Sequence, residues 1–204
     1  AARARPRDPP RRLLYLAIVL LLVGAVVLDG RGHPNAAAWV RALVGSALLL
    51  WVWKLFRPPG RADRLSYTLW SAGWILFAGL WLGVLVPERP LVGEHVVFLG
   101  GFGFLTLGIA TRVVVRHGGY PLEQESRVIG VAALVFLGLA LLLRAFAEGL
   151  DPASATKSWV LAGAAAAWMA AWGRWALRAV PLALRRPPKK ATGPAGAGGS
   201  TVKG

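Results

Sequence analysis

The sequence predicts an all-α fold, a polytopic bundle of six transmembrane helices with both chain termini in the cytoplasm. Of its 204 residues, 56% are hydrophobic and only 16% are charged. The apolar residues come in blocks of about 20, the length that crosses a hydrocarbon core. Lys and Arg gather between alternate blocks. These patterns indicate one membrane domain over residues 13–186, with a basic disordered tail at 1–12 and a disordered tail at 187–204.

The first apolar run, residues 13–28, directly follows the basic tail. A basic start before a short apolar run also describes a secretory signal, for which Ala36, Ala37 and Ala38 would form the cleavage region. We favour a retained span, because the helices that follow need an entry span to keep their topology.

Five further spans follow, separated by residues that end helices. Prolines close the second and third spans, and a Gly-Gly-Tyr-Pro turn closes the fourth. Proline lacks the backbone N–H that a helix needs, and glycine readily adopts positive φ. The sixth span is rich in Ala and Trp. These spans are predicted at residues 37–56, 65–86, 95–115, 127–147 and 157–180.

The fourth span carries the most informative pattern. His95 opens it, glycines fill its middle, and Arg112 is its single charge. Gly101, Gly108 and Arg112 lie at helical spacing on one face, which predicts a narrow groove that packs closely against a neighbouring helix. By pattern alone, the span is explained as a packing helix whose polar ends reach the membrane surfaces.

The basic residues set the predicted orientation. With both termini inside, 19 of the 24 Lys and Arg residues fall in cytoplasmic segments, as the positive-inside rule requires. The formal net charge of +15 is therefore read as a topology signal and as attraction to anionic lipid. The bilayer is the expected partner, and nucleic acid is not.

This topology places the polar candidates at two faces of the membrane. His33, His95 and Arg144 lie at the outer face, whereas Arg112 and His117 lie at the inner face. An arginine within a span is costly, so both arginines must pair with a carboxylate or reach the surface. His33 and His117 border glycine-containing turns and can also be explained as solvated turn residues.

Several kinds of chemistry are excluded by residue content. The absence of Cys excludes disulfides, cysteine-ligated iron–sulfur centres and thiol nucleophiles. No Ser or Thr stands with His and a carboxylate in a recognisable triad, so an enzyme is not favoured. The glycines among residues 100–103 resemble those of a nucleotide-binding loop. They lie within a predicted membrane helix with no strand before it, so this match is rejected. Three His residues cannot form a tetrahedral all-histidine site, whereas one can serve as an axial haem ligand.

The residues from His95 to Leu122 resemble the signature of the NnrS family. In that pattern a His opens a glycine-rich span, which closes with Thr-Arg-Val, then a His, then Gly-x-Pro-Leu. This sequence carries Thr111-Arg112-Val113 and His117 at the same intervals. It differs from the family pattern at Arg116, where Gly is usual, and at Gly118, where Thr is frequent.

The resemblance covers about residues 38–185, and it implies function. NnrS-family proteins are polytopic membrane proteins associated with haem and copper and with the bacterial response to nitric oxide and denitrification. We therefore expect a multi-pass protein of the bacterial inner membrane that binds haem, with copper as a second candidate. The expected haem and metal ligand is His95, and Arg144 is expected to pair with the propionates. Arg112 and His117 belong to the same motif at the opposite face.

His33 is the only other imidazole at the outer face, which makes it the candidate second ligand. The chain resembles the second half of the family, so a cofactor-free structural or accessory subunit remains an alternative. Such a subunit would be a homodimer or part of a larger membrane complex. A channel or transporter is a third interpretation.

Overall fold

The computed structural model describes residues 9–185, and every regular element in that part of the chain is helical. Two of the helices are π-helices, η1 and η2. In chain order the elements are α1 (Pro9–Gly30), α2 (Pro34–Ala47), η1 (Leu48–Val52), α3 (Arg64–Leu85), α4 (Pro90–His95), η2 (Val96–Phe102), α5 (Gly103–His117), α6 (Glu123–Ile129), α7 (Val131–Ala147) and α8 (Ala155–Leu184).

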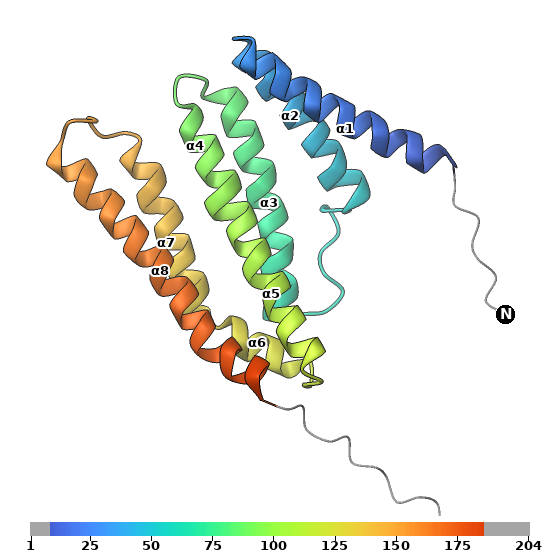
Figure 1. Cartoon of the computed structure of the whole chain (residues 1–204), viewed down its shortest axis with the longest axis vertical. Coiled ribbons are helices and arrows are strands. Elements are labelled where there is room, and N and C mark those ends of the chain that lie inside the picture. The colour runs from blue at the N-terminus through green and yellow to red at the C-terminus, as the bar shows by residue number, and fades with distance from the viewer. Residues whose placement is uncertain (1–8, 186–204) are drawn as a thin grey trace, which may run out of the picture.

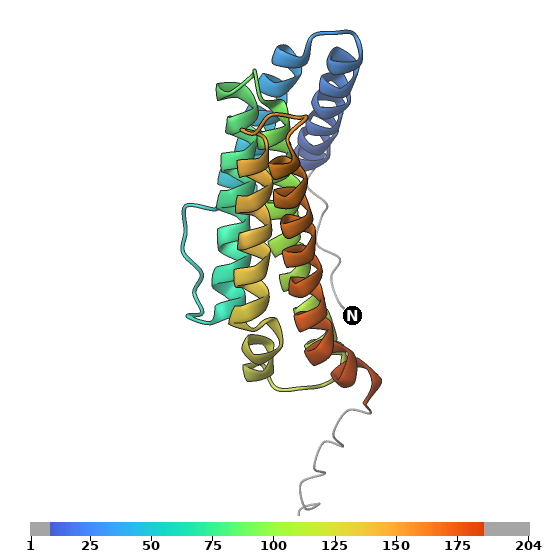
Figure 2. The same cartoon turned by 90° about the vertical axis from the view of Figure 1, so that its left-hand side faces the viewer.

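Three antiparallel helix pairs form the bundle (Figure 1). The pair α1–α2 lies on one side, α7–α8 lies on the other, and α3 with the continuous α4–η2–α5 stretch lies between them. Figure 2 views the bundle from the α7–α8 side. The turns α1–α2, α3–α4 and α7–α8 share one end, called here the α4 end. The short helix α6 crosses the opposite end, called the α6 end, beside the last turns of α5 and α8.

The helices define a multi-pass membrane protein. Four helical stretches in the described chain are long and apolar enough to cross a membrane, and α6 with α7 forms a fifth if this pair, bent by 43°, is one span. The helix α8 is 30 residues long but is not among them, because Ala, Trp and two Arg residues keep its hydropathy modest. The four stretches are Arg12–Gly30, Pro34–Val52, Arg64–Leu85 and Pro90–His117.

The helix α1 begins before the predicted boundary. The expected disordered tail ended at residue 12, yet α1 starts at Pro9. Proline is well tolerated in the first turn of a helix, where its missing N–H would have no partner. Residues 1–8 and the tail predicted at 187–204 lie outside the described residues.

The predicted continuous span 127–147 was wrong in one respect, because the helix breaks at Gly130. This glycine has φ +54° and ψ 142°, which no helix contains. A Cβ at this position would also collide with the guanidinium of Arg178. The chain therefore turns here, α6 lies across the bundle end, and α7 begins at Val131.

The predicted glycine groove is confirmed as a contact with α3. A Cβ added to Gly101 would collide with the side chain of Leu76, and one added to Gly108 would lie 2.6 Å from Leu69 Cδ2. These glycines therefore let the fourth span approach α3 closely.

A still closer crossing involves glycines that were not predicted to pack. A Cβ on Gly93 would lie 2.6 Å from the backbone N of Gly83 and 2.9 Å from the backbone O of Gly79. Gly79 and Gly83 form a GxxxG motif on α3, so the backbones of α3 and α4 touch near the α4 end. This crossing places His95, two residues beyond Gly93, beside a close backbone contact between the helices.

Candidate functional site

His95 is the last residue of α4, and η2 follows it directly. Its side chain is partly buried, and its Nδ1–H donates to the carbonyl oxygen of Leu91, one turn earlier. This bond orients the ring, and in the tautomer with its proton on Nδ1 the other ring nitrogen, Nε2, carries the lone pair. Metal-binding histidines are commonly held in this way, with one ring nitrogen bonded to a backbone carbonyl and the other presented to the metal.

Arg144 lies on α7 near the same end of the bundle. The side chain of Leu141 lies beside Gly100, and that of Leu137 lies beside Gly103. Because the later residue of one helix faces the earlier residue of the other, α7 runs antiparallel to the η2–α5 stretch. Arg144 is about one turn beyond Leu141 and therefore lies near the level of His95. Its guanidinium forms an ion pair with Glu148, which supplies the carboxylate that an arginine in a span requires.

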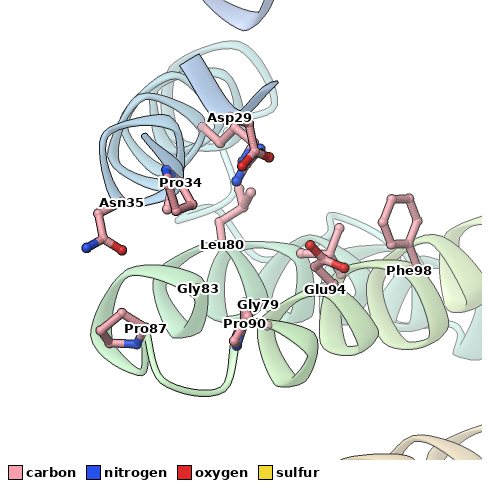
Figure 3. Close-up of a pocket in the computed structure, with 14 residues that line it drawn as sticks. Asp29, Pro34, Asn35, Gly79, Leu80, Gly83, Pro87, Pro90, Glu94 and Phe98 are labelled. Carbon is pink, nitrogen blue, oxygen red and sulfur yellow. The ribbon is translucent and has the colours of Figure 1, made fainter. Parts of the chain in front are cut away.

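His33 is also at the α4 end, in the turn between α1 and α2, and its side chain is exposed. Nearby, a cavity of about 540 Å³ separates this turn from the α3–α4 pair (Figure 3). Asp29 and Arg41 form an ion pair of 2.9 Å on one wall, and Glu94 and Phe98 line another wall.

The cavity has a size typical of cofactor pockets, but neither His33 nor His95 lines it, although each is next in sequence to a lining residue, Pro34 or Glu94. Among the described residues no cluster of three or more His, Asp or Glu side chains could hold a metal ion. His95 offers one imidazole at this end, and a single imidazole is the kind of side chain that ligates haem iron.

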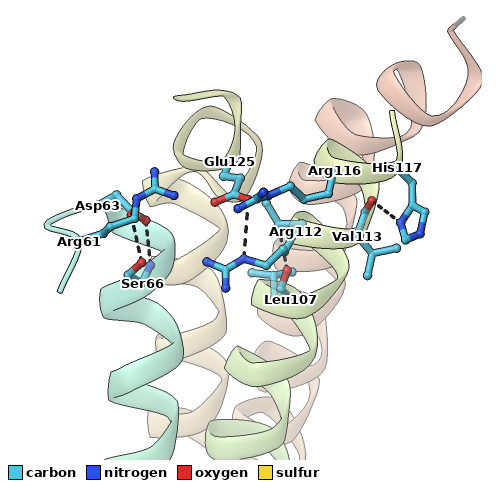
Figure 4. A network of polar contacts seen from close by, with 10 residues as sticks. Arg61, Asp63, Ser66, Leu107, Arg112, Val113, Arg116, His117 and Glu125 are labelled. Atoms are coloured by element: carbon cyan, nitrogen blue, oxygen red, sulfur yellow. Dashed lines mark hydrogen bonds and ion pairs between the residues drawn. The ribbon is translucent and has the colours of Figure 1, made fainter. Parts of the chain in front are cut away.

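The α6 end carries a different site, in which one buried carboxylate faces two arginines (Figure 4). Glu125 is 1% exposed, and its Oε1 lies 3.6 Å from Arg112 Nε and 3.3 Å from Arg116 Nε. The other carboxylate oxygen of Glu125, Oε2, and the Nε of Arg112 are buried without a hydrogen-bond partner. The cluster has a net charge of +1, and both guanidinium groups are partly exposed.

The motif residues around this cluster have separate structural roles. Thr111 donates from its hydroxyl to the carbonyl of Leu107 and accepts from Trp175 Nε1 at 2.9 Å, which ties α5 to α8. His117 is exposed at the end of α5, where its ring bonds the carbonyl of Val113. The structure thus places His95 near the start and His117 at the end of one continuous helical stretch and does not bring them together.

Asp63 completes the polar residues at this end of the bundle. It caps α3 by accepting from the backbone N–H and the hydroxyl of Ser66, and Arg61 Nε lies 3.1 Å away. Burial alone would raise the pKa of Asp63. The two bonds from Ser66 and the charges of Arg61 and Arg112 outweigh it and hold this pKa below its ordinary value of 3.8.

Sequence reasoning predicted that Arg112 and Arg144 must pair with a carboxylate or reach the surface, but it did not assign Glu125 and Glu148 as their partners. A usable signal was present in each case. Glu148 stands four residues after Arg144, which is ion-pair spacing on a helix. Glu125 is one of two acidic residues directly after the turn that ends α5.

Two indole N–H groups on α8, those of Trp168 and Trp172, are buried without an acceptor.

Fold and polar sites together define a multi-pass helical membrane protein with a charged cluster at each end of its spans. The chain belongs to the NnrS family, because the family model described as NnrS protein matches residues 1–187. This match is wider than the resemblance over 38–185 and includes α1 and the turn that holds His33. The curated proteins and the solved structures compared with the chain yielded no match.

Proposed function

We propose that this protein binds haem at the α4 end and acts in the nitric-oxide response of a bacterial inner membrane. The observation that carries the proposal is the state of His95. This residue opens the family motif, it is partly buried whereas His117 is exposed, and it follows Glu94, which lines the cavity at the α4 end. Bound haem would supply an iron that can take nitric oxide as a ligand.

Three residues of the chain would hold the haem. His95 is the proposed axial ligand, on a helix anchored by the Gly93 crossing. His33 is the proposed second ligand, on a turn that would have to approach His95. Arg144 would pair with a propionate, sharing its charge with Glu148. Copper is the second cofactor candidate. Its usual protein ligands are Cys, Met and His, and because the chain has no Cys and one Met, histidines would be its main ligands here.

The proposed topology has six spans and cytoplasmic termini. The helix α8 is counted as the sixth span because it packs along α7 over most of its length. Charge supports the orientation, since the inward segments would then hold 19 of the 24 Lys and Arg residues. Arg112 and His117 would face the cytoplasm and hold the inner end of the motif helix.

A reduced-minus-oxidised absorption spectrum of the detergent-purified protein tests the proposal. The wild type should show a Soret band, His95→Ala should lose it, and His117→Ala, the matched control on the same helical stretch, should keep it. Loss of the band only in the His117 variant would overturn the ligand assignment. A band that neither substitution changes would overturn the site.

The second candidate is a cofactor-free accessory subunit, alone as a homodimer or within a larger complex. It is favoured by the separation of the histidines from the cavity at the α4 end. A colourless wild-type protein that is dimeric by mass measurement in detergent would support this candidate over the first.

A further inference from the structure

A second cavity, of about 650 Å³, lies at the α6 end where α3, α6, α7 and α8 meet. Four of its twelve lining residues are arginines, and none is acidic. The arginines come from three separate helices and from the residue after α8, so only the folded chain brings them together. They are Arg64, Arg127, Arg178 and Arg185.

These four arginines differ from the arginines of the two polar sites. Arg112, Arg116 and Arg144 each lie beside a carboxylate. Within residues 9–185, none of the four cavity arginines forms an ion pair with an acidic side chain. All four side chains are exposed to solvent, and four like charges around one cavity make it attractive to an anion.

Two of the arginines are held in place by the chain itself. Arg64 Nη1 donates to the carbonyl of Ser126 at 2.7 Å, and Arg178 Nη1 donates to that of Arg127 at 3.0 Å. The break at Gly130 makes room for Arg178, because any Cβ there would collide with its guanidinium. These bonds use one nitrogen of each guanidinium and leave the others for a ligand. The first turn of α7 lines the same cavity and adds a smaller positive potential.

The surroundings indicate the source of the anion. Apolar residues of α7 and α8 also line the cavity, and two of these residues, Val131 and Leu177, are 55% and 71% exposed. On a membrane-spanning helix, such a surface contacts acyl chains. Arginines beside an acyl-chain surface match the two halves of an anionic phospholipid, because guanidinium groups bind phosphate oxygens through paired hydrogen bonds.

We propose that this cavity binds the phosphate headgroup of an anionic phospholipid, with the acyl chains lying along α7 and α8. Basic pockets between transmembrane helices commonly bind cardiolipin-type headgroups. The site is independent of the haem site, from which the length of the bundle separates it. It would fix α6 and the ends of α3 and α8 against the membrane surface.

The test is lipid binding to the full chain in detergent, measured by native mass spectrometry with cardiolipin, phosphatidylglycerol and phosphatidylcholine of equal acyl chains. Arg127→Gln/Arg185→Gln is the informative variant, because neither side chain makes a hydrogen bond within the described structure. Lys54→Gln/Arg57→Gln removes the same charge from an exposed loop outside the cavity and is the control.

The wild type and the loop variant should bind cardiolipin and phosphatidylglycerol in preference to phosphatidylcholine. In the cavity variant, affinity for the anionic lipids should fall about tenfold or more. Arg127→Lys/Arg185→Lys, which keeps the charge, should show a smaller loss and remains informative if the Gln pair does not fold.

Equal losses in the cavity and loop variants would overturn the proposal in favour of general surface charge. Equal binding of phosphatidylcholine would overturn it in favour of apolar contact alone. Displacement of the lipid by millimolar inorganic phosphate would assign the cavity to a soluble anion. Each outcome is distinct from loss of the Soret band, which concerns the other end of the bundle.

Discussion

At the scale of single residues, the inner end of the motif depends on one carboxylate. Arg112 and Arg116 are four residues apart on α5, and both reach Glu125 on α6. Two neighbouring arginines without a counter-charge would repel each other at the membrane surface. A buried charge is tolerated only when it is paired, so the three side chains are stable as a group and unfavourable apart.

Replacing Glu125 with Gln should destabilise the protein in detergent. We expect a loss of about 2 kcal/mol, below the 3–5 kcal/mol of a fully buried pair, because both arginines are partly exposed. Thermal unfolding compared with Glu123→Gln, an exposed acid two residues away, measures the effect. If the two variants melt at the same temperature, the pairing adds nothing to stability.

The cap at Asp63 should make α3 stability depend on pH. The pKa of Asp63 is lowered in the folded state, so its contribution is fully present above the ordinary value of 3.8 and is lost as pH falls through the folded pKa. Asp63→Ala should cost about 1 kcal/mol at pH 7. The difference in melting temperature between wild type and variant should shrink only below about pH 4. A difference that already shrinks between pH 7 and 5 would show that another group is responsible.

At the scale of helices, glycine contacts decide how closely the spans approach. The tightest crossing joins α4 to α3, where an added Cβ at Gly93 would meet backbone atoms of Gly79 and Gly83. At Gly108 the nearest atoms belong to the side chain of Leu69, which can move. Backbone atoms cannot yield in the same way, so the two positions should respond differently.

Gly93→Leu should therefore destabilise the bundle more than Gly108→Leu. Gly138→Leu on α7 should have little effect, because nothing lies within 4 Å of a Cβ at that position. Melting temperatures of the three variants in one detergent give the order. If Gly93→Leu and the wild type have the same melting temperature, α3 and α4 do not cross as closely as described. Because His95 follows this crossing, the Gly93 variant should also weaken any Soret band.

At the scale of the whole molecule, the central α3 and α4–η2–α5 stretch connects two outer pairs. The α1–α2 pair packs on α3 through α2, and the α7–α8 pair packs on η2 and α5. Both charged cavities lie at the margins of this central pair, one at each end. The charged side chains that line these cavities therefore lie toward the ends of the spans.

Reporter fusions test the orientation of the whole bundle. A reporter fused after Lys203 should be active only in the cytoplasm, and one inserted between Glu88 and Arg89 should be active only in the periplasm. The second fusion serves as the matched control, since the α3–α4 turn lies at the opposite end of the spans. Periplasmic activity of the fusion after Lys203 would refute the six-span topology.

The sequence by itself determined the all-helical membrane class and the family. Long apolar runs ended by proline and glycine predict membrane helices, since each run satisfies its own backbone hydrogen bonds. The spacing from His95 to His117 carries the NnrS resemblance, which the family match confirms. These signals are local, and each can be read from about 20 neighbouring residues, the length of one span.

Only the tertiary structure decided which distant residues meet. Gly130 breaks the fifth span by its positive φ, and Arg178, 48 positions later, occupies the space that a Cβ at this position would need. Glu125 becomes the partner of two arginines because the turn after α5 folds α6 back across the bundle end. The four cavity arginines come together only when α3, α6 and α8 pack. Such contacts depend on the relative placement of helices, which no local pattern contains.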